Sequence, residues 1–169
     1  MASATADEKL SLNGSCHCGA IKFKVDNAEP NKATKCNCTI CNAAGTISIM
    51  VADGDLKLVM KDGTTQAITY KNAKEDLIPE LSTYNMSEPT ESHQVNHHFC
   101  SKCGIHCFLT GYLEVMGGSF NCANLRVLNL KEHGKDIKDY SGPGHVQYCD
   151  GLANTWATRN DEPYPGGAW

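Results

Sequence analysis

Two short cysteine-rich stretches decide the fold of this chain: GSCHCG at residues 14–19 and FCSKCG at residues 99–104. Each stretch carries two cysteines close together. The four cysteines are Cys16, Cys18, Cys100 and Cys103. Zinc takes four ligands in a tetrahedron and binds cysteine thiolate readily, so the two pairs together would complete the coordination of one zinc ion. Because the pairs lie far apart in the sequence, such an ion would link the two ends of a domain and contribute directly to folding.

A third cluster, KCNCTIC at residues 35–41, predicts a different kind of metal site. It places Cys36, Cys38 and Cys41 within six residues. Three protein ligands leave one coordination position free, which is the usual pattern of a catalytic zinc. Thiolates are soft donors, so the free position would suit an external thiol. A protein side chain is the alternative fourth ligand, with three candidates: His97, His98 and Cys107. We therefore expect two zinc ions per chain.

Composition limits the classes of protein to which the chain can belong. It has 169 residues, which fits one domain, and 15 basic against 19 acidic side chains give a net charge of −4. No basic run stands out, which argues against a nucleic-acid partner, and no apolar stretch approaches the length of a membrane span. Residues 1–12 show no pattern of a secretory signal and are expected to form a disordered lead-in.

The ten cysteines admit two interpretations, disulfides in a secreted protein or reduced thiols on metal. Seven of the ten lie in tight clusters, where neighbouring cysteines rarely bond to each other but easily share an ion. With no signal peptide apparent, we expect reduced cysteines and a cytoplasmic location. Three cysteines stand alone and are expected to be buried apolar residues: Cys107, Cys122 and Cys149. Of these, Cys122 falls in a strand that could border a pocket.

Hydrophobic alternation predicts a mainly β domain over residues 13–158, followed by an irregular tail at residues 159–169. Residues 46–52 and 56–60 flank Asp53-Gly54, which is a hairpin pattern. Further strands are expected in five stretches: residues 20–25, 67–71, 106–110, 113–116 and 119–125. Residues 72–91 are polar and read as a loop with at most one short strand.

The sequence resembles the glutathione-dependent formaldehyde-activating family, whose domain is also called the CENP-V/GFA domain. The matching stretches are GSCHCGAIKFKV, KCNCTICNAAG and HHFCSKCGIHCF, with NCANLRVLNL and YCDGLANTW as weaker echoes. They follow the order of the family from about residue 13 to residue 156. Three cysteine clusters at these separations make the match specific.

The resemblance implies a fold, a pair of metal sites and a reaction. The fold would consist of small antiparallel sheets arranged like tents and stapled by zinc. The first and third clusters would hold a structural zinc, and Cys36, Cys38 and Cys41 a catalytic one. Family members are described as carbon–sulfur lyases that join or separate glutathione and a small electrophile such as formaldehyde. The family often has a histidine three residues before the first cysteine of the last pair, which makes His97 the acid–base candidate.

The chemistry suggests how such a site would act. A thiol at the free zinc position would lose its proton, because the cation stabilises thiolate. The thiolate would attack a carbonyl carbon, or leave again when the carbon–sulfur bond breaks. Lys35 abuts the cluster and Arg126 lies in a segment that could border it, so both are candidates for binding the anionic tripeptide.

Alternatives remain for the substrate and for the class of function. The electrophile need not be formaldehyde, because the polar stretch at residues 71–91 and the tail depart from a plain bacterial pattern, and such loops shape pockets. A non-catalytic zinc-binding interaction module and a redox or zinc sensor are the rival functions. The expected partner is a small thiol or thioether, and an oligomer is compatible with the sequence.

Overall fold

The computed structural model describes residues 8–73, 77–167 and 169, and the fold is mainly β. The smaller of its two sheets is antiparallel throughout. Its strands, in spatial order, are β1 (Leu10–Ser15), β2 (Lys22–Ala28), β5 (Leu56–Val59) and β6 (Thr65–Ala67). The hairpin between β5 and β6 turns at Gly63, whose positive φ of 84° suits a glycine.

The larger sheet has eight strands. In spatial order they are β12 (Thr155–Asn160), β11 (Gln147–Asp150), β3 (Thr34–Cys36), β4 (Ser48–Val51), β10 (Gly118–Asn124), β9 (His106–Leu113), β8 (His93–Cys100) and β7 (Leu81–Tyr84). The pair β3–β11 is parallel and the other pairs are antiparallel. The prediction of a mainly β fold is confirmed, but this sheet is larger than the small antiparallel sheets expected and is mixed.

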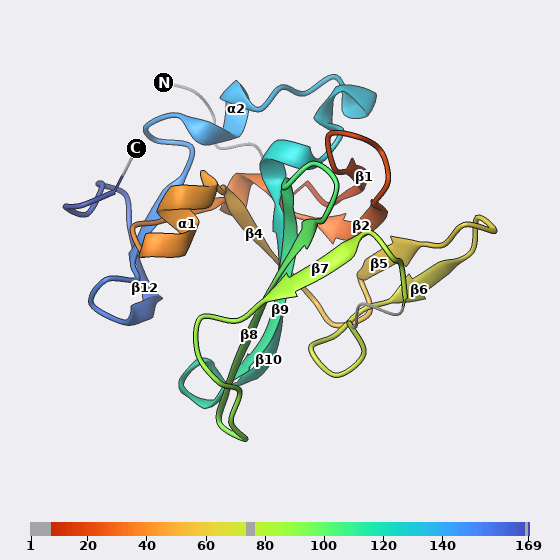
Figure 1. Ribbon diagram of the computed structural model, residues 1–169. Coiled ribbons are helices and arrows are strands. Elements are labelled where there is room, and N and C mark those ends of the chain that lie inside the picture. The colour runs from red at the N-terminus through yellow and green to blue at the C-terminus, as the bar shows by residue number, and fades with distance from the viewer. Residues whose placement is uncertain (1–7, 74–76, 168) are drawn as a thin grey trace.

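Helices are few and short among the described residues. They are α1 (Thr39–Ala44), α2 (Lys138–Ser141), and four 3₁₀ turns: η1 (Pro30–Lys32), η2 (Glu114–Met116), η3 (Leu125–Val127) and η4 (Leu130–His133). In Figure 1, α1 and β12 lie on one side of the long strands β8, β9 and β10, and the β5–β6 hairpin lies on the other. No helix in the described part of the chain is long and apolar enough to cross a membrane.

The core lies between the two sheets, because the larger sheet buries one of its faces against the smaller one. Ile49 on β4 and Phe108 on β9 belong to the buried cluster. The rings of Phe23 and Phe108 meet edge to face, with centroids 5.3 Å apart. Alternation along each strand sends the next residue to the opposite face. That opposite face of the larger sheet is therefore free to line a cavity.

Asp53-Gly54 does not form the expected hairpin. Strand β4 pairs with β3 and β10, whereas β5 pairs with β2 and β6, so the two strands belong to different sheets. The Asp53 carboxylate accepts hydrogen bonds from Ser119 Oγ at 2.7 Å and Asn121 Nδ2 at 3.0 Å, both on β10. The turn thus passes the chain from one sheet to the other. The pairing of β4 and β5 with other strands therefore outweighs the local preference of Asp-Gly for a hairpin turn.

The stretch expected as a lead-in, residues 1–12, overlaps strand β1. Leu10 and Leu12 are buried, so these residues belong to the smaller sheet; residues 1–7 lie outside the described residues. The expected strand at residues 113–116 is mostly the turn η2, which ends at Gly117 with φ 88°. The tail after β12 contains no further strand among its described residues.

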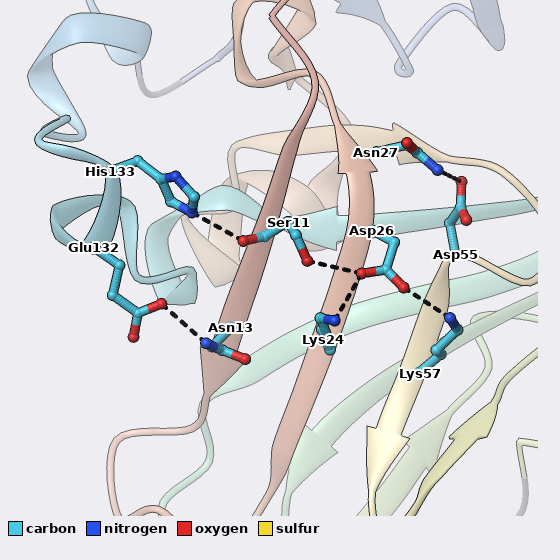
Figure 2. A network of polar contacts seen from close by, with 9 residues as sticks. All are labelled: Ser11, Asn13, Lys24, Asp26, Asn27, Asp55, Lys57, Glu132 and His133. Carbon is cyan, nitrogen blue, oxygen red and sulfur yellow. Dashed lines mark hydrogen bonds and ion pairs between the residues drawn. The ribbon is translucent and has the colours of Figure 1, made fainter.

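A polar network fastens the outer surface of the smaller sheet. Asp26 on β2 accepts hydrogen bonds from Ser11 Oγ at 2.8 Å and Lys57 Nζ at 2.7 Å, and it pairs with Lys24 at 3.1 Å (Figure 2). These contacts, with Lys57 first, hold the pKa of Asp26 below its ordinary value. The network joins β1, β2 and β5. Figure 2 also shows Asn13 and Glu132 attaching β1 to the segment of η4.

Candidate metal centres and cavity

The structure brings Cys16, Cys18, Cys100 and Cys103 together. Their sulfur atoms all lie within 4.8 Å of one another. The Sγ atoms of Cys16 and Cys18 are 3.6 Å apart, and those of Cys18 and Cys100 are also 3.6 Å apart. Four sulfurs around a zinc ion at about 2.3 Å lie about 3.8 Å from one another in a tetrahedron. The donor set therefore fits a four-thiolate zinc site.

The backbone around this cluster is shaped to support thiolates. Each cysteine pair is followed by a glycine with positive φ, 76° at Gly19 and 71° at Gly104. The Ile21 amide donates to Cys16 Sγ at 3.2 Å. Hydrogen bonds from the backbone amides of Cys18 and Ile105 lower the pKa of Cys103 to about 6. One pair follows β1 and the other ends β8, so the cluster joins the two sheets.

Cys36, Cys38 and Cys41 form the second cluster, with their sulfur atoms also within 4.8 Å of one another. Cys36 ends β3, Cys38 caps α1, and Cys41 lies in the first turn of that helix. All three are half-buried, and the Cys38 amide donates to Cys36 Sγ at 3.4 Å. A short helix that starts directly after a strand is what folds three thiols toward one point. The donor set fits a metal ion with three protein sulfurs.

A fourth thiol lies beside this cluster. Cys149 on β11 is the register partner of Cys36 in the parallel pair β3–β11. The side chain of Cys149, followed by those of Cys38 and Cys41, lowers the pKa of Cys36. Gly151 makes room here, because a Cβ at this position would lie 2.5 Å from Cys36 Sγ and 2.7 Å from the Cβ of Cys38.

The second cluster opens onto a cavity of about 440 Å³. Its floor is the face of the larger sheet that does not pack on the smaller one. Polar and charged side chains of the lining include His93, His97 and Arg159, while Cys122 lies on the floor with its Sγ 3.2 Å from Met50 Sδ. Apolar lining residues from the floor and the rim are Met50, Met86, Val95, Leu109, Leu113, Met116, Phe120, Leu152 and Trp156.

The structure separates the three residues considered as a fourth ligand. His97 lines the cavity and is buried, and its Nδ1 has no hydrogen-bond partner among the described residues. Burial, with a smaller effect of the nearby His106, lowers the pKa of His97 to about 4. His98 faces the core, where its ring nitrogens contact Thr83 Oγ1 and Thr110 Oγ1. Cys107 is buried beside the four-cysteine cluster.

Lys35 and Arg126 do not line this cavity. Thr34 and Cys36 do, so alternation along β3 sends Lys35 to the opposite face. Burial and the charge of Arg126 lower the pKa of Lys35, which places these two cations near each other. Arg126 lines a separate, more open cleft of about 790 Å³, whose other polar residues include His17. The structure therefore does not bring these cations to the three-cysteine cluster.

The sequence did not indicate that Cys149 and Arg159 line the cavity. Cys149 is buried, as expected, but it also lies beside Cys36, and its surroundings, YCDGLANTW, belonged to a recognised motif. Arg159 lies in the segment expected as an irregular tail and had no signal of its own. Its charge acts on both Cys122 and Cys149, so the guanidinium lies close to the floor of the cavity. Cys122 does lie on the cavity floor, in the strand where the sequence suggested a pocket.

The fold and the two cysteine clusters define a class: a mainly β protein with one cluster between its sheets and another at a cavity. Comparison with known protein families identifies the family within this class. The profile of the family described as glutathione-dependent formaldehyde-activating enzyme (GFA) matches residues 11–135, well over half of the chain. The chain belongs to this family, as its three cysteine motifs suggested.

A curated relative carries a similar name. The protein named "Putative glutathione-dependent formaldehyde-activating enzyme" from Halomonas elongata is 29% identical over 92 residues, which cover 54% of this chain and 51% of the relative. The chain thus matches about half the length of that relative. No solved structure matches the chain significantly.

Proposed function

We propose that this chain is a zinc-dependent carbon–sulfur lyase, which forms or cleaves the bond between the sulfur of glutathione, or a similar thiol, and a carbon electrophile. One observation carries the proposal: three cysteine sulfurs within 4.8 Å of one another line one end of a cavity large enough for a ligand. A metal held only for stability has no need of a cavity. The name of the family supports the choice of glutathione as the thiol.

Two zinc ions per chain are proposed, one for each cluster. Cys36, Cys38 and Cys41 would hold the ion at the cavity, and the other four cysteines would hold the structural ion. Bound at three thiolates with a free position, zinc supplies a Lewis acid that stabilises the substrate sulfur as a thiolate. The thiol of Cys149, the register partner of Cys36, would remain outside this set of three.

The side chains of the cavity then have separate tasks. His97, neutral at physiological pH because burial lowers its pKa to about 4, would accept the proton of the thiol or of a hydroxyl on the electrophilic carbon. Its free Nδ1 is available for that contact. Arg159 would attract a carboxylate of the tripeptide, a task first considered for Lys35 and Arg126. Gly151 keeps the approach to Cys36 clear.

The test follows the carbon–sulfur bond directly. Zinc-loaded protein is incubated with glutathione plus formaldehyde or larger aldehydes, and separately with glutathione thioethers, and the products are identified by mass spectrometry. We expect bond formation or cleavage in at least one series, and none with Cys38→Ser. Full zinc content without turnover in any series would contradict the proposal and favour a zinc-binding interaction module or a sensor. The cytoplasmic location also remains a proposal.

A further inference from the structure

The floor of the cavity continues past His97. The pairing register orders its floor into rows that cross the strands. His97, Leu109, Cys122 and Met50 form one row across β8, β9, β10 and β4. The next row is Val95, Gly111 and Phe120, and the third contains His93 and Leu113.

The three-cysteine cluster lies at one end of this series of rows. Strand β3 pairs with β4 through Thr34 and Ser48, and β3 runs antiparallel to β4. Cys36 therefore lies beyond Ser48, on the side away from Met50, while Val95 and His93 follow on the far side of the His97 row. His93 lies four positions before His97 on β8, which is about 14 Å of extended strand. The cavity thus continues well past the candidate acid–base residue.

Apart from His93 in the third row, this far part of the cavity is apolar. Val95, Leu113, Met116 and Phe120 line it, and no carboxylate is among the residues that line the cavity in the described part of the chain. The Phe120 ring lies against Gly111, where a Cβ would come within 2.5 Å of it, so the ring covers the sheet instead of filling the space above it. Met50, in the first row, and Met86 are 47% and 54% exposed, although apolar side chains of this size usually bury more of their surface.

Glutathione itself does not account for such a wall, because it is a polar, charged tripeptide. A hydroxymethyl group does not account for it either, because that group is small and polar. Resting on the proposed function, we infer that the apolar rows beyond His97 form a subsite for a bulky apolar carbon group. The substrate class is then a thioether of glutathione, or of a similar thiol, that carries an alkyl or aromatic group.

Binding of inert thioethers tests the subsite without requiring turnover. S-methyl-, S-butyl- and S-hexylglutathione carry unactivated carbon, so calorimetric titration into the zinc-loaded protein measures binding alone. Each methylene that leaves water for an apolar wall strengthens binding up to about fourfold. We expect S-hexylglutathione to bind at least about tenfold more tightly than S-methylglutathione. Equal affinities across the series would overturn the inference.

A matched pair of variants tests whether the gain in affinity arises at the apolar rows beyond His97. Val95→Phe fills the second row and should remove most of the gain for S-hexylglutathione while leaving S-methylglutathione within about twofold. Val115→Phe makes the same change at a position that is 78% exposed and outside the cavity lining, and should change neither affinity. A gain that survives Val95→Phe would overturn the inference.

The same experiments separate this inference from the proposed function. Turnover of the formaldehyde adduct with equal affinities for all thioethers would overturn the subsite and leave the lyase in place. Size-dependent binding that Val95→Phe abolishes, together with no turnover in any series of the mass-spectrometric test, would overturn the lyase and leave the subsite.

Discussion

The two cysteine clusters use the same donor atom and do different things for the fold. The four-cysteine cluster takes its sulfurs from the ends of β1 and β8, one strand from each sheet, and two of those sulfurs are fully buried. The three-cysteine cluster takes all its sulfurs from six consecutive residues on one sheet, and all three are half-buried at a cavity. Metal at the first would close a loop of about 80 residues, whereas metal at the second closes almost none.

This contrast teaches that sequence separation, more than ligand type, decides what a cysteine site does. In a site built from distant segments, the free energy of metal binding adds to the stability of the fold. A site built from one strand–helix junction can lose its metal while the sheets stay joined, so its ligands are free to serve chemistry. The predictions below test this difference, starting with the largest effect.

Cys100→Ser should give the largest loss of stability. Cys100 is fully buried and belongs to the cluster between the sheets, so its loss removes metal-derived folding energy and leaves a buried hydroxyl. We expect the free energy of unfolding to fall by at least about 3 kcal/mol, measured by denaturant titration. Cys107→Ala is the control, because Cys107 is buried nearby but is not one of the four. A smaller loss for Cys100→Ser than for Cys107→Ala would contradict the structural assignment.

Cys38→Ser should have the opposite effect, a small change in stability and a large loss of activity. Because the three-cysteine cluster does not join the sheets, the free energy of unfolding should change by about 1 kcal/mol or less. Bound zinc should fall from about two ions to about one, and kcat/KM by at least about 10²-fold, since a Lewis acid supplies several kcal/mol to the transition state. Metal analysis and steady-state kinetics measure these changes. A wild-type protein with one zinc ion would refute the two-site account.

His97→Asn and His98→Asn separate the two faces of β8. His97 lines the cavity, so its replacement should lower kcat about 10²-fold with unchanged zinc content. His98 contacts Thr83 and Thr110 in the core, so its replacement should cost about 1–3 kcal/mol of stability and leave kcat of the folded protein near the wild-type value. Equal kinetic losses in both variants would argue against a role for His97 in the reaction.

Asp26→Asn should have the smallest effect, because the network around Asp26 fastens one sheet only. The pKa of Asp26 is lower in the folded protein than its ordinary value of 3.8. The carboxylate therefore stabilises the fold above that pH, and this contribution is lost as the pH falls through the lower, folded-state pKa. We expect a loss of about 1 kcal/mol at pH 7 that shrinks toward zero below pH 4, from denaturant titrations across this range. A constant difference at all pH values would point to a cause other than the charge.

The sequence predicted the parts of this structure that depend on local chemistry. Cysteine spacing identified both clusters, and hydrophobic alternation identified β2, β4, β5, β9 and β10. The sequence-based prediction failed where contacts between distant segments determine the structure. Asp53-Gly54 joins two sheets, because Ser119 and Asn121 on β10 bind the Asp53 carboxylate. Strand β1 begins within the expected lead-in, because Leu10 and Leu12 are buried in the core. Arg159 and Cys149 reach the cavity through the pairing of β11 with β3 and β12, which no local pattern announces.

The central claim is that the three-cysteine cluster holds a metal whose free position receives the substrate sulfur. Cobalt tests it most directly, because cobalt in a thiolate site reports its ligands through its absorption spectrum. In cobalt-loaded protein, we predict that glutathione or a glutathione thioether changes the thiolate-to-metal band, and that Cys38→Ser loaded with cobalt shows no such change. A wild-type spectrum that stays the same at substrate concentrations that support turnover would contradict the claim.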